Sequence, residues 1–182
     1  MAGQKSAANT QVGDHPFLRA VAALSTVAGW CSAAMIVTAV AITCQMIFVR
    51  FVLNGSTVWQ TEMVVYLVIG ATLVGLAYVQ RLRGHVNVDL IPLAMPAKAR
   101  RAMAVLTLSL SIAIIAVMLW YGFDYWHFAW ERGWKSDTVW GVRLWIPYLA
   151  LPVGFGLLML QLIADLVGVL TGAETPFGLE NN

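Results

Sequence analysis

Residues 102–123 read AMAVLTLSLSIAIIAVMLWYGF, a run of 22 amino acids without a charged side chain. In an α-helix, which rises about 1.5 Å per residue, this run extends for about 33 Å. That length matches the roughly 30 Å hydrocarbon core of a bilayer. The stretch therefore predicts a transmembrane helix, and the rest of the chain is best interpreted from it.

Three further stretches carry no charge, and each is long enough to cross a bilayer as a helix. They cover residues 20–49, 63–80 and 144–164, with 30, 18 and 21 residues. The first is longer than the apolar part of a signal peptide, about 7–15 residues, so we expect it to be retained. We also expect it to tilt or to project beyond the lipid. The predicted fold is an all-α membrane protein with four transmembrane helices, at about 20–49, 59–80, 102–126 and 143–166.

The composition agrees with a membrane protein. Of the 182 residues, 60% are hydrophobic and 11% are charged, against about 25% charged in an average soluble domain. So few charges could not cover this much apolar surface in water. We predict one membrane domain over residues 1–182, with polar tails at 1–18 and 171–182. The net charge of +2 and the scattered basic residues give no support for nucleic-acid binding.

The two cysteines, Cys31 and Cys44, lie in the same uncharged stretch. In one helix, thirteen residues separate them by about 20 Å, so they cannot form a disulfide with each other. In the same stretch Ser25, Gly29 and Ala33 recur every four residues. Ala71 and Gly75 do the same in the second stretch, and small residues at this spacing let helices approach closely in lipid.

Basic residues predict the orientation in the membrane. One side of the four-helix arrangement holds seven of them: Lys5, Arg19, Arg81, Arg83, Lys98, Arg100 and Arg101. The opposite side holds four: Arg50, Arg132, Lys135 and Arg143. Because cytoplasmic loops carry an excess of Lys and Arg, both termini are predicted to be cytoplasmic.

The connection between the first two spans contains residues that favour the end of one helix and the start of the next. Arg50 and Glu62 suit the negative end of one helix dipole and the positive end of the next. The hairpin predicts that they approach each other; the alternative is two independent residues that face water, since exposed ion pairs are weak. Thr57 and Gln60 have the spacing of a capping box.

Two other regions suggest contacts at the membrane surface. Residues 81–101 mix basic and apolar side chains, which predicts a short interfacial helix after the second span. Trp126, Trp130 and Trp134 recur at helical spacing on the side that also holds Trp59. The tryptophans fit either an interfacial anchoring belt or a docking surface for another protein.

The sequence shows no sign of catalytic chemistry. None of the four uncharged stretches contains an ionisable group, although such groups mark proton and ion pathways in membranes. There is no phosphate-binding loop, pair of convergent carboxylates or cluster with zinc spacing. The three histidines, His15, His85 and His127, are not placed for haem ligation inside the helices. We therefore predict that the chain is not an enzyme and has no catalytic, cofactor-binding or metal-binding residues.

Two segments resemble a known family. The run RFVLNGS at 50–56, continuing to Trp59 and Glu62, is similar to the DctQ-like small membrane subunit of tripartite ATP-independent periplasmic (TRAP) transporters. The loop after the second span resembles the same family, and the matching residues there are Arg81, Gly84, His85 and Asp89. The resemblance extends over nearly the whole chain.

This resemblance implies a static scaffold in the bacterial inner membrane, bound to a large multispanning membrane subunit. That partner would hold the substrate and sodium sites and move as an elevator, and a periplasmic binding protein would deliver the substrate. The implied cargo is an organic acid: a dicarboxylate, sialic acid, keto acid or sulfonate. Arg50, Trp59 and Glu62 would support the hairpin and the docking face, whereas Arg81, His85 and Asp89 would shape the inner loop. A histidine at position 85 that bonds only to local backbone is the alternative.

Two alternatives from other classes stay open on sequence alone. The first is a membrane anchor of a redox enzyme that holds haem or quinone between four helices. The second is a small drug exporter that works as a dimer, for which Glu62 is the only candidate carboxylate. The sequence does not identify a substrate.

Overall fold

The computed structural model describes residues 16–82 and 96–171, and every helix in these ranges is an α-helix. In chain order the helices are α1 (Pro16–Phe51), α2 (Val58–Arg81), α4 (Ala97–Glu131), α5 (Trp145–Tyr148) and α6 (Ala150–Thr171). Four segments are long and apolar enough to cross a membrane: α1, α2, Lys98–Glu131 of α4, and Trp145–Thr171, which joins α5 and α6. The prediction of an all-α protein with four transmembrane helices is confirmed.

Some predictions fall on residues outside the described ranges. The interfacial helix predicted within residues 81–101 falls mostly on residues 83–95, which are outside the described ranges, as are Gly84, His85 and Asp89. Most of both polar tails lies outside as well.

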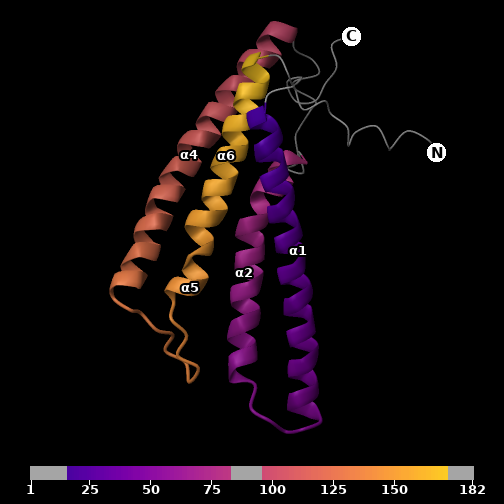
Figure 1. The fold of residues 1–182 in the computed structure, drawn as a ribbon, viewed down its shortest axis with the longest axis vertical. Helices are drawn as coiled ribbons and strands as arrows, with labels where there is room; N and C mark the ends of the chain where they lie inside the picture. The colour runs from indigo at the N-terminus through magenta and orange to yellow at the C-terminus, as the bar shows by residue number, and fades with distance from the viewer. Residues whose placement is uncertain (1–15, 83–95, 172–182) are drawn as a thin grey trace, which may run out of the picture.

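The four long segments form two pairs that share a central contact (Figure 1). α1 packs along α2, α4 packs along α6, and α2 contacts α6 between them. Pro16 at the start of α1 and Thr171 at the end of α6 lie at the same end of the bundle, as an even number of spans requires. We call this the terminal end, and we call the opposite end, with connections 52–57 and 132–144, the loop end.

The helices run beyond the predicted spans because a helix does not stop at the edge of the hydrocarbon. α4 begins five residues before position 102 and ends five after position 126. Its 35 residues extend for about 52 Å, well over the roughly 30 Å of apolar lipid. The added turns hold charged residues such as Lys98 and Glu131, which suit the headgroup layers better than the hydrocarbon.

Small residues bring α1 and α2 together, as the four-residue spacing predicted. A Cβ atom added at Gly29 would lie 2.5 Å from Cγ of Tyr78, and one at Gly75 would lie 2.8 Å from Oγ of Ser32. The Ser32 hydroxyl also donates a 2.7 Å hydrogen bond to the carbonyl of Ala71. In lipid the hydrophobic effect does not drive helices together, so their association depends on interhelical hydrogen bonds and close backbone packing.

The buried core consists mainly of small side chains, among them Ser25, Ala71 and Ala77, each with 2% or less of its surface exposed. Few residues of α1 and α4 are buried in this chain, whereas α6 is the most buried of the four spans. Large apolar side chains such as Trp30 and Trp120, each 75% exposed, point away from the bundle. The outer faces of α1 and α4 are therefore left for lipid or for another protein.

The fourth span is divided into α5 and α6 at Leu149. Pro152 has no N–H with which to bond the carbonyl of Tyr148, so one helical hydrogen bond is missing at this point. The neighbouring bond, from the N–H of Val153 to the carbonyl of Leu149, is kept at 3.2 Å. The break between α5 and α6 therefore lies within one helical turn of Pro152.

Cys31 and Cys44 are both free and exposed, in agreement with the helical separation predicted for them.

Candidate functional site

Glu62 connects α2 to the connection 132–144, which we call the aromatic loop. Thr138 donates a 2.8 Å hydrogen bond to Oε2 of Glu62, and the Ser136 hydroxyl donates to Oε1. The hydroxyl of Tyr66, one helical turn further along α2, also reaches Oε1 at 3.3 Å. The carboxylate thus holds a loop that lies more than seventy residues away in the sequence.

The predicted approach of Arg50 and Glu62 is wrong. No ion pair joins these two residues, both of which lie in the described part of the chain, and the Glu62 carboxylate accepts from hydroxyl groups instead. Arg50 stands exposed in the last turn of α1, where a cation suits the helix dipole without a partner.

The predicted capping box does not form either. α2 begins after Thr57, as expected, but the Thr57 side chain makes no capping hydrogen bond. Gln60 turns toward α1, where its Nε2 donates to Oε1 of Gln45 at 3.4 Å. Gln60 is buried, and this contact between helices replaces the local contact that the spacing indicated.

Trp59 gives α2 a second contact with the aromatic loop. Its ring centroid lies 6.3 Å from that of Trp140, with the planes tilted by 59°. Both rings keep part of their surface open, 43% for Trp59 and 39% for Trp140. The two rings and the Glu62 cluster therefore form one continuous contact between α2 and the loop.

The aromatic loop has its own backbone order. An antiparallel bridge pairs Lys135 with Arg143, and the N–H of Ser136 donates a 2.8 Å hydrogen bond to the carbonyl of Val142. Gly133 and Gly141 both have φ of 59°, a left-handed conformation that glycine adopts without steric cost. These turns direct the loop back toward α2.

The three tryptophans of α4 and the adjoining loop belong to two groups of aromatic contacts. Trp126 and Trp130 lie 5.9 Å apart, and Trp130 meets Trp145 of α5 edge-on at 4.5 Å. Trp134 packs edge-on against Phe128 at 5.1 Å. Tyr125 links Trp134 to Tyr148 of α5, with ring centroids 6.4 Å and 5.0 Å apart. Both groups therefore join the end of α4 to α5, a structural role that neither the belt nor the docking interpretation included.

At the terminal end, Arg81 ties the last turn of α2 to α1. Its guanidinium donates a 2.8 Å hydrogen bond to the carbonyl of Ala22 and a second bond to the Thr26 hydroxyl. A planar guanidinium carries several fixed N–H donors, so it can serve both acceptors at once.

A polar cluster that the sequence did not predict lies close to Arg81. Ser25 of α1 donates a 2.6 Å hydrogen bond to Gln161 of α6, and Gln161 in turn donates to Asp165 at 2.7 Å. Gln80 of α2 donates to the other oxygen of Asp165 at 2.9 Å. We call Ser25, Gln80, Gln161 and Asp165 the three-helix cluster. Its only signal in the sequence is that each polar residue falls toward the same end of its span.

The described residues do not bring metal-ligand side chains together. Across residues 16–82 and 96–171, no group of three or more His, Cys, Asp or Glu is placed to hold a metal ion. His127 lies at the loop end of α4 with Nδ1 3.8 Å from Glu131.

The fold and these contacts define a small multi-pass membrane protein in which several polar side chains of the described helices join one helix to another. The chain belongs to the family of DctQ components of tripartite ATP-independent periplasmic transporters, whose pattern matches residues 39–172. The match includes Arg50, Trp59, Glu62, Arg81 and the three tryptophans, whereas Ser25 lies before it.

A named relative supports the same family. The C4-dicarboxylate TRAP transporter small permease protein DctQ of Vibrio cholerae serotype O1 is 26% identical over 147 residues. The alignment covers 69% of this chain and 63% of the relative, so the chain spans less than two thirds of that protein's length.

Proposed function

We propose that this chain is the small membrane subunit of a TRAP uptake system and acts as a static scaffold for a large multispanning membrane subunit. The family match over residues 39–172 is the observation that carries this proposal. It makes the chain a transporter component, and the contacts described above favour a supporting role within the transporter.

The polar groups of the described helices support a scaffold because they are used for helix packing. The three-helix cluster joins α1, α2 and α6, and Glu62 holds the aromatic loop. A pathway for solute needs polar groups along a cavity through the membrane, whereas these two clusters stand at opposite ends of the bundle. Cargo and sodium would therefore be handled by the large subunit.

The outer faces of α1 and α4 fit a partner in the membrane. Their apolar residues are largely exposed in this chain, and a large subunit that packs on either helix would cover them. We further propose that the loop end faces the periplasm, where Trp59 and Trp140 would meet the substrate-binding protein. The terminal end would then face the cytoplasm, as the excess of basic residues predicts for a protein of the bacterial inner membrane.

The cargo proposed for this system is an organic acid. The Vibrio cholerae relative is named for C4-dicarboxylates, which makes dicarboxylates the first class to test. Sialic acids, keto acids and sulfonates follow as the other classes that the family resemblance implied.

The proposal is tested by purification and reconstitution. Affinity-tagged chain should copurify with a large multispanning protein, and uptake of a C4-dicarboxylate into proteoliposomes should need both proteins, a soluble binding protein and a sodium gradient. Transport by this chain alone would favour the small exporter instead. A haem absorbance spectrum from the purified chain would favour the redox anchor, and either result would overturn the scaffold proposal.

A further inference from the structure

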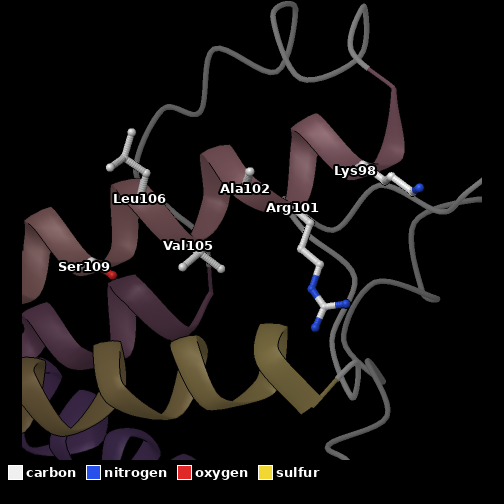
Figure 2. Close-up of a pocket in the computed structure, with 6 residues that line it drawn as sticks. All are labelled: Lys98, Arg101, Ala102, Val105, Leu106 and Ser109. Atoms are coloured by element: carbon white, nitrogen blue, oxygen red, sulfur yellow. The ribbon is translucent and has the colours of Figure 1, made fainter.

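An open groove lies along the first three turns of α4 at the terminal end (Figure 2). It has a volume of about 580 Å³ and is lined by Lys98, Arg101, Ala102, Val105, Leu106 and Ser109. Basic side chains stand at one end of this groove and apolar side chains follow along the helix.

The basic end offers several donors to an anion. Lys98 is exposed, and its side chain points away from the neighbouring helix in Figure 2. Arg101 extends toward the end of α6, where its Nη2 donates a 2.8 Å hydrogen bond to the carbonyl of Leu170. A guanidinium has five N–H donors, so this single bond orients Arg101 and leaves it able to bind a phosphate.

The start of α4 adds to this positive field. The first turn of the helix contains no acidic residue, and the free N–H groups of a helix N-terminus favour an anion. Three features therefore lie at this end of the groove: two cationic side chains, a helix start and the open mouth of the groove.

The remainder of the groove fits a hydrocarbon chain. Ala102, Val105 and Leu106 line it, and 70% of the Leu106 surface is exposed. From Lys98 to Ser109 the helix rises about 16 Å, which is close to half of the roughly 30 Å hydrocarbon core. The groove thus has the length of one leaflet.

We propose that this groove binds one anionic phospholipid, with its phosphate at Lys98 and Arg101 and an acyl chain along Ala102, Val105 and Leu106. The cationic end selects a lipid with net negative charge over a zwitterionic one. The apolar part selects a lipid over a free phosphate ion, because a free ion gains nothing from it. The proposal does not depend on which large subunit the chain joins.

The test uses full-length chain, with any partner that copurifies, in detergent micelles. Native mass spectrometry measures bound lipid during titration with phosphatidylglycerol, and phosphatidylcholine of the same acyl chains is the comparison. We expect phosphatidylglycerol to bind at least about fivefold more tightly, since each basic residue near the surface favours an anionic lipid. Equal binding of the two lipids would overturn the proposal, and so would displacement of the lipid by millimolar inorganic phosphate.

Variants locate the site. The double substitution Lys98→Gln and Arg101→Gln should weaken phosphatidylglycerol binding about tenfold. The matched control, Lys135→Gln with Arg143→Gln, removes the same charge at the loop end and should leave binding unchanged. If both pairs weaken binding equally, the effect is one of net charge and the proposed site is wrong.

Two further variants guard against a loss of folding, because Arg101 also contacts α6. Lys98→Gln alone leaves that contact intact and should still reduce phosphatidylglycerol binding. Ala102→Trp keeps both charges but fills the groove, so it should reduce binding of the acyl chain. Unchanged binding in both variants would overturn the proposal. A photo-crosslinker placed at Leu106 in the intact complex gives an independent test. Attachment to a partner protein and not to lipid would also overturn the proposal.

Discussion

Ser25 of α1 and Gln161 of α6 are 136 positions apart in the sequence and share a 2.6 Å hydrogen bond inside the protein. Both side chains are almost fully buried, with 2% and 5% of their surfaces exposed. Gln161 also donates to Asp165, which accepts from Gln80. The Ser25–Gln161 bond is therefore part of a hydrogen-bond network that joins α1, α2 and α6. The terminal end is thus held by polar contacts, while the loop end is held by aromatic rings and Glu62.

The Ser25–Gln161 bond should contribute measurably to stability. We expect Ser25→Ala and Gln161→Leu to destabilise the protein, and a double-mutant cycle should give a coupling free energy of about 0.5–1.7 kcal/mol, the range of interhelical hydrogen bonds in membranes. Unfolding by sodium dodecyl sulfate in mixed micelles measures it. Thr38→Ala is the control, because the exposed Thr38 hydroxyl bonds only to the carbonyl of Ala34 in its own helix. A coupling energy of zero would contradict the network.

Gly154 sits where α6 touches the backbone of α2. A Cβ at this position would lie 2.7 Å from both C and O of Leu73, and backbone atoms cannot move aside as a side chain can. We expect Gly154→Ala to cost about 1–3 kcal/mol, as overpacking does. Gly156→Ala is the matched control two residues on in the same helix, where no atom lies within 4 Å. That control should be neutral or slightly stabilising, since alanine is the better helix former.

Glu62 should control the order of the aromatic loop. Glu62→Ala removes the acceptor for Ser136 and Thr138, so residues 134–144 should exchange amide hydrogen for deuterium faster, as followed by mass spectrometry. Glu131→Ala removes an exposed acid at the same end and should leave exchange in the loop unchanged. Exchanging Arg50 and Glu62 should not rescue either single charge reversal, because the two residues form no pair. Rescue by that exchange would restore the interpretation drawn from the sequence.

Orientation can be checked with single cysteines in a chain in which Cys31 and Cys44 are replaced by serine. Ser56→Cys lies in the exposed connection between α1 and α2, and Thr171→Cys lies at the exposed end of α6. With a membrane-impermeant maleimide on spheroplasts, we expect labelling at position 56 and none at 171 until the membrane is broken. The reverse pattern would place the termini outside the cell and contradict the positive-inside prediction.

The number and approximate positions of the spans followed from the sequence because lipid imposes a strict rule. A segment in hydrocarbon must satisfy its backbone hydrogen bonds internally and carry few charges, so the uncharged runs such as 102–123 mark the helices directly. The same helical geometry kept Cys31 and Cys44 apart, and the four-residue spacing placed Gly29 and Gly75 at the contact of α1 with α2.

The contacts of Glu62 show why local pattern failed elsewhere. Arg50 was the neighbour predicted for Glu62, yet Glu62 is bonded by Ser136 and Thr138, which lie 74 and 76 positions away. Spacing reports which residues share a helix face or a turn, and it carries no information on which loop returns to which helix.

The sequence alone determined that this chain is a four-span membrane protein with its charged groups toward the ends of the helices, because a charge in the middle of a hydrocarbon-spanning run costs free energy. Only the tertiary structure decided that α2 and α6 meet at the centre, that Ser25 reaches Gln161, and that Glu62 holds the aromatic loop. In lipid, apolar side chains gain little by choosing one neighbour over another, so helix pairing depends on close backbone approach and on a few hydrogen bonds between residues far apart in the chain.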